Sequence, residues 1–398
     1  MKIVIGVAGS RGDVLPFISL ATQLQQRGYG VTLVAPEKYR SLAMKHQVVM
    51  VSCGEGFETY LEEGRDQGDR SEDFVRRVAL QTATQFVSLK DATRDANAII
   101  GSPMLVAGPS IAELCSIPYV TVIRHPWLLS REHYPLLGIS EREVSGIFGA
   151  MRQKNRRQQW DEIMGEALNQ ERANHHLPAV QDLYQHLFQS GQVVAALDEE
   201  LTPPPSGARA SGLLYHHDPL PLEPEVQSRL SEGKPPVYFA VVSEPVAEPA
   251  NLLKRLCETA ESLGHRAVVG SSWKGVQQND LPGGCSIIDD DVAFGYLNSM
   301  SVVVHSGSTG ISTASAVAGI PQVAVPYLRD QTYWASRISE TGIGPPPPGE
   351  YSLREVGSAL KQALSDPKIR TQAQEWGKKL QSKQSVSTVA DAVEAALI

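Results

Sequence analysis

The sequence has little cysteine and no long apolar run, and each shortage excludes a class of protein. Only four cysteines occur in 398 residues, scattered and without the spacing of metal or redox motifs. This distribution argues against a disulfide-stapled scaffold and favours reduced thiols. No stretch is apolar over the length that a membrane span requires, and the N-terminus reads as a strand instead of a signal peptide. We expect a soluble, cytoplasmic protein without a transmembrane segment.

Positive charge is also in short supply. The formal net charge is −8, which argues against nucleic acid or an anionic membrane surface as the main partner. Hydrophobic residues at 42% and charged residues at 20% are ordinary for a globular protein. A chain of this length exceeds one typical core, so two domains are expected.

Strands and helices alternate in the first half. Residues 2–8 form an apolar run typical of a strand buried on both faces, and apolar residues then recur at helical spacing until Gly28. Residues 29–35 read as the next strand, so one β-α-β unit closes early and predicts a parallel sheet. Further strand-like runs follow at 48–52, 96–102, 119–123 and 193–197, and residues 131–190 are polar and helical.

A proline-rich passage separates the halves, with three clusters between residues 202 and 238. Proline cannot occupy a helix interior, so we expect an irregular connection. The strand–helix alternation restarts at residue 237 and continues to the end. We predict an N-terminal domain at 1–215, a linker at 216–235, a C-terminal domain at 236–375, and a last helix at 376–398 that could pack back on the first domain.

The most informative turn lies in the second half, after the strand-like run that ends at His305. A Gly/Ser/Thr turn follows, and a helix begins near Gly310. Backbone N–H groups and the positive end of a helix would then converge on one place, which suits a diphosphate. Gly307 and Gly310 allow close approach, and Ser308, Thr309 and the His305 ring supply donors. The hydroxyl residues could equally be simple helix caps.

Residues 302–345 resemble the donor-binding segment of the UDP-dependent glycosyltransferases, closest to the bacterial branch with glycopeptide, polyketide and sterol glucosyltransferases. The shared features are the His-x-Gly opening, "AGIPQ" at 318–322, Asp330-Gln331 and the closing "GIGP" at 342–345. The resemblance implies an α/β GT-B fold of two facing Rossmann-like domains with parallel sheets and an interdomain cleft. It also implies that the N-terminal domain at 1–215 binds the acceptor and that the C-terminal domain at 236–375 binds the nucleotide sugar. It implies an inverting transfer without a metal or other cofactor, with the UDP-sugar as co-substrate.

The same resemblance assigns roles in the donor site. His305, Ser243 and the turn formed by Gly307, Ser308, Thr309 and Gly310 would hold the diphosphate. Asp330 and Gln331 would hold hydroxyls of the sugar, a task for which acceptor-rich side chains are suited. The alternative is that this pair only caps the following helix. Trp273 and Val292 are candidates for the nucleotide base.

Asp13 is the candidate catalytic residue. It lies in "GDVLP" at 12–16, where many relatives have histidine as general base, and the glycopeptide and sterol branch is similar in having aspartate. A carboxylate in reach of the acceptor hydroxyl can take its proton during attack on the sugar. A helix N-terminus favours the ionised form and burial opposes it, so the sequence leaves the balance open. Asp is also a favoured N-cap, and both roles can coexist.

Several positions depart from the family pattern. Ser306 replaces a usual second histidine, Val242 a glycine, Glu244 a methionine, and Ile311 a threonine. These changes leave the fold unaffected but bear on donor binding. On the acceptor side, His125 and Trp127 follow a strand end and could meet an apolar acceptor, or could simply pack in a capped loop.

The leading hypothesis is an inverting glycosyltransferase that moves a hexose from UDP to a hydroxyl of a lipophilic small molecule, and glucose is the favoured hexose. The alternatives are a catalytically inactive homologue that acts as an accessory or binding protein, and a sugar-nucleotide epimerase. The sequence leaves open the acceptor, UDP against dTDP, and the oligomeric state.

Overall fold

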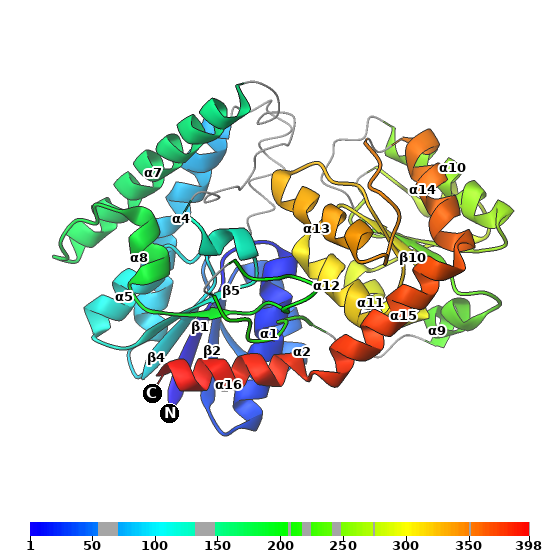
Figure 1. The fold of residues 1–398 in the computed structure, drawn as a ribbon. Helices are drawn as coiled ribbons and strands as arrows, with labels where there is room; N and C mark the ends of the chain where they lie inside the picture. The colour runs from blue at the N-terminus through cyan, green and yellow to red at the C-terminus, as the bar shows by residue number, and fades with distance from the viewer. Residues whose placement is uncertain are drawn as a thin grey trace. The chain divides into compact units, whose positions relative to one another are not determined.

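The computed structural model describes residues 1–54, 71–131, 148–205, 208–216, 224–240, 248–273, 275–349 and 352–397, and all statements below refer to these. The chain divides into two compact units (Figure 1). Unit 1 comprises Met1–His216 and Gln384–Ile398, and unit 2 comprises His217–Lys383. Each unit carries one sheet of parallel strands flanked by helices, which confirms the predicted α/β class.

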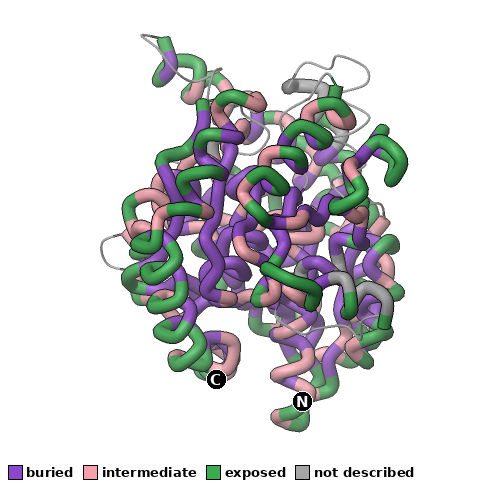
Figure 2. The backbone as a smooth tube through the Cα atoms, turned by 90° about the vertical axis from the view of Figure 1, so that its right-hand side faces the viewer, coloured by how far each residue is buried: buried purple, intermediate pink, exposed green. Residues whose placement is uncertain are grey.

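Unit 1 is built on a six-stranded sheet in the order β3-β2-β1-β4-β5-β6. All neighbouring strands are parallel. The strands are β1 (Lys2–Gly6), β2 (Gly30–Ala35), β3 (Val49–Ser52), β4 (Ala98–Gly101), β5 (Tyr119–Ile123) and β6 (Gln192–Ala195). Every residue of β4 and β5 is buried, as their continuous apolar sequence predicts. Figure 2 shows buried residues gathered in the interior and exposed residues on the outer turns of the helices.

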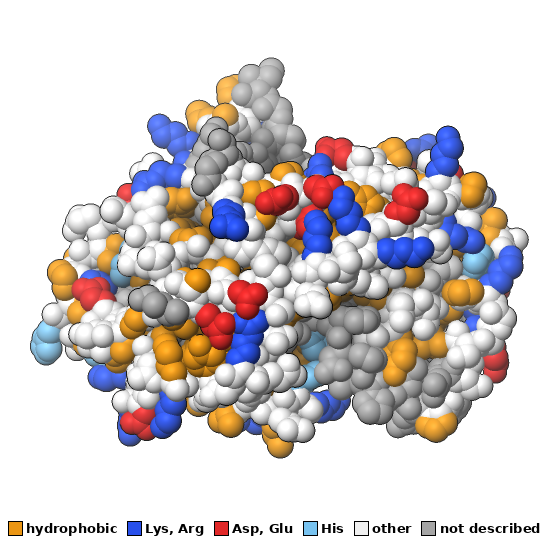
Figure 3. Space-filling view, turned by 60° about the horizontal axis from the view of Figure 1, so that its bottom comes forward, with side chains coloured by type: hydrophobic (Ala, Val, Ile, Leu, Met, Phe, Trp, Pro, Cys, Tyr) orange, Lys and Arg blue, Asp and Glu red, His pale blue; other side chains and the backbone are white. Residues whose placement is uncertain are grey.

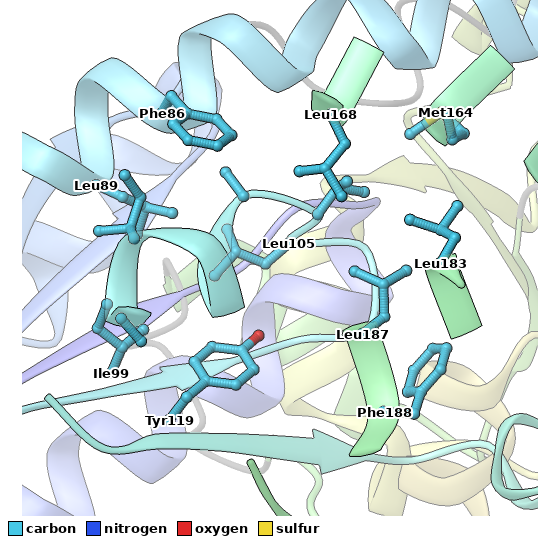
Figure 4. Close-up of a cluster of buried hydrophobic side chains, with 14 of the residues drawn as sticks. Phe86, Leu89, Ile99, Leu105, Tyr119, Met164, Leu168, Leu183, Leu187 and Phe188 are labelled. Atoms are coloured by element: carbon cyan, nitrogen blue, oxygen red, sulfur yellow. The ribbon is translucent and has the colours of Figure 1, made fainter. Parts of the chain in front are cut away.

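The helices of unit 1 cover this sheet. They are α1 (Arg11–Gln26), α2 (Arg40–Lys45), α4 (Ser71–Ala92), α5 (Gly108–Cys115), α7 (Gly149–Asn174), α8 (Leu183–Gln189) and α16 (Ser385–Leu397), with short 3-10 turns η1 (Glu37–Tyr39) and η2 (Pro126–Leu129). Helices α4, α7 and α8 share a hydrophobic cluster with the sheet (Figure 4). Phe86, Leu168 and Leu187 point into it, so the polar region predicted as helical has one apolar side facing the core.

Helix α16 returns to unit 1 and lies beside α1. The Arg27 guanidinium, at the end of α1, pairs with Asp391 at 2.7 Å and with Glu394 at 2.5 Å. Gly212 has φ +91°, and a Cβ there would lie 3.0 Å from the Ser385 carbonyl oxygen. The compact part of unit 2 extends past residue 375 to Lys383, so the unit boundary falls between α15 and α16.

Unit 2 contains a five-stranded parallel sheet in the order β11-β10-β7-β8-β9. Its strands are β7 (Val237–Phe239), β8 (Ala267–Gly270), β9 (Cys285–Ile288), β10 (Val302–His305) and β11 (Gln322–Ala324). Its helices are α9 (Pro224–Ser231), α10 (Pro249–Ser262), α11 (Asp290–Gly295), α12 (Thr309–Ala318), α13 (Arg329–Glu340), α14 (Leu353–Ser365) and α15 (Pro367–Ser382), with η3 (Gln278–Asp280) and η4 (Leu297–Ser299). Two hydrophobic clusters hold these elements together.

The predicted linker at 216–235 differs from the expected irregular chain, because α9 forms within it. Pro224 is the first residue of that helix, where its fixed φ is compatible with helix and no backbone donor is needed. The proline-rich composition therefore marks the start of this helix. Residues 217–223 of the linker lie outside the described residues.

Three further observations concern the surface, the helices and the cysteines. On the face shown in Figure 3, acidic and basic side chains lie interspersed instead of gathering into one patch. Within the described part of the chain, no helix combines the length and apolar character needed to cross a membrane. The four cysteines are all unbridged.

Candidate functional site

The turn from β1 into α1 positions Asp13 in unit 1. Helix α1 begins at Arg11 with Ser10 as its N-cap, so Asp13 is the third helical residue and not the cap itself. Its Oδ2 accepts hydrogen bonds from the Ser10 backbone N–H at 2.8 Å and from the Ser10 hydroxyl at 3.0 Å. Gly9 has φ +138°, and a Cβ there would lie 2.5 Å from Asp13 Oδ2. Glycine at this position therefore leaves room for the carboxylate.

The other carboxylate oxygen of Asp13 points toward His125. Asp13 Oδ1 lies 4.0 Å from His125 Nε2, and the Asp13 side chain is 33% exposed. Burial raises the pKa of Asp13, but His125, the positive charge of Arg124 and the Ser10 N–H outweigh burial, so the pKa is lowered overall. The sequence left this balance open, and the structure decides it in favour of the carboxylate at neutral pH.

His125 lies close to Asp13, and Trp127 lies next to His125. Both lie at the start of η2, directly after β5, and their rings are 4.9 Å apart and tilted by 37°. Trp127 is partly buried against the core of unit 1. The structure thus brings both acceptor-side candidates to the end of β5. Their contact with an acceptor stays a prediction.

In unit 2, the turn between β10 and α12 is organised around His305. The ring is fully buried, and its Nδ1 accepts from the Gly307 backbone N–H at 2.9 Å. The proton therefore resides on Nε2, which donates to Gln322 Oε1 at 2.9 Å. Gln322 Nε2 in turn donates to the Ser312 carbonyl at 3.2 Å. Burial lowers the pKa of His305 to about 4, so the ring is neutral.

The His305 side chain belongs to the interior of unit 2. Both ring nitrogens bind protein groups, and the ring has no exposed surface. The physical reason is that β10 continues the buried sheet up to this residue, so its side chain enters the interior. His305 therefore fixes the shape of the turn, and its contact with a diphosphate stays a prediction.

The turn that follows His305 abuts the start of α13. Gly307 has φ +83°, and a Cβ there would lie 2.9 Å from the Gln331 carbonyl oxygen. Trp334, on α13, donates its indole N–H to Thr309 Oγ1 at 2.7 Å. Ser308 is the N-cap of α12, with Thr309 and Gly310 as its first two residues. The structure therefore places five of the predicted donor-site positions on one turn next to Asp330 and Gln331.

Gln331 has a structural role in the start of α13. Its Oε1 accepts from the backbone N–H groups of Tyr327 and Leu328, each at 3.0 Å, and the side chain is 3% exposed. The predicted helix-capping alternative is therefore observed for Gln331. Asp330 lies beside it in the first turn of α13 and is partly exposed. Sugar binding by this pair stays a prediction.

The remaining donor candidates divide into two groups. Trp273 is 6% exposed, belongs to the core of unit 2 and donates its indole N–H to the Phe239 carbonyl at 3.2 Å. Trp273 is therefore a core side chain of unit 2, and its contact with a nucleotide base stays a prediction. Val292 lies on α11, but its side chain is outside what the structure describes, as is Ser243 entirely.

Three residues support these turns from other elements, and the sequence did not predict this role for them: Arg124, Gln322 and Trp334. The hydrogen bonds of Gln322 and Trp334 support the donor-side turn. Arg124 reaches the β1–α1 turn from the end of β5. Its signal was Pro16, which lacks the N–H that would bond the Gly12 carbonyl inside a helix.

The two halves match models of known domains. Residues 3–133 match the glycosyltransferase family 28 N-terminal domain, and residues 257–396 match the erythromycin biosynthesis protein CIII-like C-terminal domain. With the relatives described next, these two matches show that the chain is a glycosyltransferase.

Relatives and solved structures agree with this assignment. The chain is 27% identical to the vancomycin aglycone glucosyltransferase of Amycolatopsis orientalis, over 92% of this chain and 90% of that protein. It is 25% identical to sterol 3-beta-glucosyltransferase UGT80B1 of Arabidopsis thaliana, over 98% of this chain and 67% of that protein. The crystal structure of the glycotransferase of kitacinnamycin superposes with a TM-score of 0.72 at 14% identity, covering 100% of this chain and 99% of that one, and supports the fold.

Proposed function

We propose that this glycosyltransferase moves glucose from UDP-glucose to a hydroxyl of a lipophilic small molecule, with inversion at the anomeric carbon and Asp13 as general base. The observation that carries the proposal is the state of Asp13, a partly exposed carboxylate held ionised at the N-terminus of α1. An anion at this position accepts a proton, whereas a protonated carboxyl would not.

In the proposed reaction, the acceptor oxygen attacks the anomeric carbon while the bond from that carbon to the diphosphate oxygen breaks. The nucleoside diphosphate leaves with the bonding electrons, and Asp13 takes the hydroxyl proton. A proton transfer of this kind contributes roughly 10²–10⁴-fold to the rate. Oδ1 is the oxygen available for it, because Oδ2 already accepts two hydrogen bonds from Ser10.

For the donor, the proposal relies on the turn between β10 and α12. His305 fixes its conformation by accepting from the Gly307 N–H, and Trp334 by donating to Thr309 Oγ1. The N–H groups at the start of α12 are therefore oriented before a ligand arrives. Such a helix N-terminus favours the negative charge of a diphosphate. Asp330 and Gln331 adjoin this turn, and we propose them as the contacts for the sugar hydroxyls.

Calorimetric titration with UDP, UDP-glucose, UDP-N-acetylglucosamine and dTDP-glucose tests the donor. We expect saturable binding of UDP-glucose, with UDP alone binding as well. Tighter binding of dTDP-glucose would replace the proposed donor. Binding of none of the four would favour an accessory protein. Where a donor does bind, a panel of sterol and polyphenol acceptors, with Asp13→Asn as the control, tests the transfer itself.

A further inference from the structure

Arg124 is a buried cation with an unusual set of partners. Its side chain is 4% exposed at the end of β5. Nε donates to the Leu214 carbonyl at 3.1 Å, and one Nη donates to the Gly12 carbonyl at 2.6 Å. The other Nη has no hydrogen-bond partner among the described residues. Burial lowers the pKa of the Arg124 guanidinium to about 10, so it still carries its charge at neutral pH.

The Gly12 carbonyl explains why a donor is needed there. In an α-helix the N–H of residue 16 would bond the carbonyl of residue 12, but residue 16 is proline and has no N–H. A carbonyl that is sheltered from water and left without a donor destabilises the fold. Arg124 supplies the missing donor from another element, and so fixes the first turn of α1 against the end of β5.

The positive charge of Arg124 acts on Asp13, the residue that follows Gly12. Asp13 is the acidic group whose charge raises the pKa of Arg124, and Arg124 in turn lowers the pKa of Asp13. The other groups that face the carboxylate are His125, after β5, and the Ser10 N–H on its own helix. By contrast, Arg172, a second deeply buried arginine among the described residues of unit 1, pairs directly with Glu113 at 2.8 Å.

We propose that Arg124 is a positioning residue for Asp13: its hydrogen bond to the Gly12 carbonyl holds the turn that carries the carboxylate, and its buried guanidinium places a positive charge beside that turn. The inference rests on the proposed role of Asp13 as base, and it adds Arg124 to His125 and Ser10 as groups that offset the effect of burial on that carboxylate. Arg124 does not need to touch either substrate.

The test follows the protonation of Asp13 directly, in the full chain labelled with [4-13C]aspartate. The Asp13 resonance is assigned by its loss in Asp13→Asn, and its chemical shift is followed from pH 7 downward. In Arg124→Met we expect the Asp13 carboxylate to protonate about one pH unit higher than in the parent protein. Arg124→Lys, which keeps the charge, should leave the midpoint near the parent value.

Arg172→Met is the matched control, because it also removes a buried guanidinium from unit 1. The native Arg172 guanidinium donates to Ser110, Glu113 and the Pro178 carbonyl, and not to the turn that carries Asp13. The Asp13 midpoint should not move in this variant. An unchanged midpoint in Arg124→Met, or an equal rise in Arg124→Lys, overturns the electrostatic role. Should Arg124→Met fail to fold, Arg124→Gln replaces it, because its amide can still donate to one carbonyl.

Turnover separates this inference from the function on which it rests. With a glucosyl acceptor in hand, Arg124→Met should lower kcat, move the acid limb of the kcat/KM profile to higher pH, and leave KM for the donor within about twofold. Full activity in Asp13→Asn would refute the base, even if the NMR coupling held. Loss of activity in Asp13→Asn with an unshifted limb in Arg124→Met would refute only the role of Arg124.

Discussion

The β1–α1 turn of unit 1 and the β10–α12 turn of unit 2 have the same local design. Each follows a buried parallel strand, contains a glycine with positive φ, and enters a helix capped by serine. They differ in where the titratable side chain points. Asp13 belongs to the helix and stays partly exposed and ionised, whereas His305 belongs to the strand and is buried and neutral.

The difference shows that the element carrying a titratable side chain decides its role. On the helix the side chain is available for a reaction, and on the strand it stabilises the turn. A side chain in the first helical turn can face solvent at the carboxyl end of the sheet, where parallel α/β folds bind ligands. The last residue of the strand instead points into the layer between sheet and helix. The Asp13 carboxylate is therefore ionised, whereas the His305 ring is neutral and stabilises its turn through two hydrogen bonds.

The largest effect is expected at Asp13. Asp13→Asn keeps the shape and an oxygen that can accept from the Ser10 N–H, but it removes the base. We expect kcat to fall by roughly 10²–10⁴-fold with donor binding unchanged. Steady-state kinetics and calorimetry measure the two separately.

Ser10→Ala provides the contrast to Asp13→Asn. It removes the hydroxyl donor to Oδ2 and keeps the backbone donor. Its loss of kcat should be smaller than tenfold. Equal losses in both variants would mean that the turn, and not the carboxylate, is what the reaction needs.

The next effect is expected at Gly307. In Gly307→Ala the new Cβ would lie 2.9 Å from the Gln331 carbonyl oxygen, at a φ of +83°. We expect a loss of about 1–3 kcal/mol in the free energy of unfolding, measured with urea, together with weaker binding of the nucleotide.

Gly233→Ala is its matched control in unit 2. Gly233 also has positive φ, +63°, but a Cβ there would have nothing within 4 Å. It should share the backbone strain and lack the contact with α13. Nucleotide binding that weakens equally in both variants would contradict the importance of that contact.

Acid should weaken the His305 brace. The pKa of His305 is about 4 in the folded protein against 6.5 for the ordinary group, so the unfolded chain binds more protons between these values. Its contribution to stability is complete above pH 6.5 and is lost as the pH falls toward 4. Between pH 7 and pH 5 the loss from this group is about 2 kcal/mol.

The variant His305→Gln should remove that part of the pH dependence. Urea unfolding at pH 7 and pH 5 measures it, with His186→Gln as a comparison in unit 1, because burial also lowers the pKa of His186 to about 4. His305→Gln should be less stable than the parent at pH 7 and approach it at pH 5. A gap that stays constant with pH would contradict a neutral, buried ring.

How far the sequence predicts each turn depends on the distance over which its contacts act. Hydrophobic period and glycine placement are local, and they predicted the strand–helix order on both sides of the molecule. The partner of the His305 ring lies 17 positions away at Gln322, and the donor for Gly12 lies 112 positions away at Arg124. Which ring nitrogen binds what, and whether a histidine points inward, follows from such contacts and not from the motif.

The smallest effect is expected at the brace from α13. Trp334→Phe keeps most of the buried ring and removes the indole N–H that donates to Thr309 Oγ1 at 2.7 Å. We expect a loss of about 1 kcal/mol in the free energy of unfolding, and a comparable loss in nucleotide binding if α12 needs this bond to hold its N-terminus. Thr309→Val removes the acceptor with little change in shape, so the pair forms a double-mutant cycle. Once the bond is gone, the second substitution should cost less than it does alone, in urea unfolding and in calorimetry alike. Additive losses in binding would mean that Trp334 acts through packing, and that the donor-side turn is held from His305 alone.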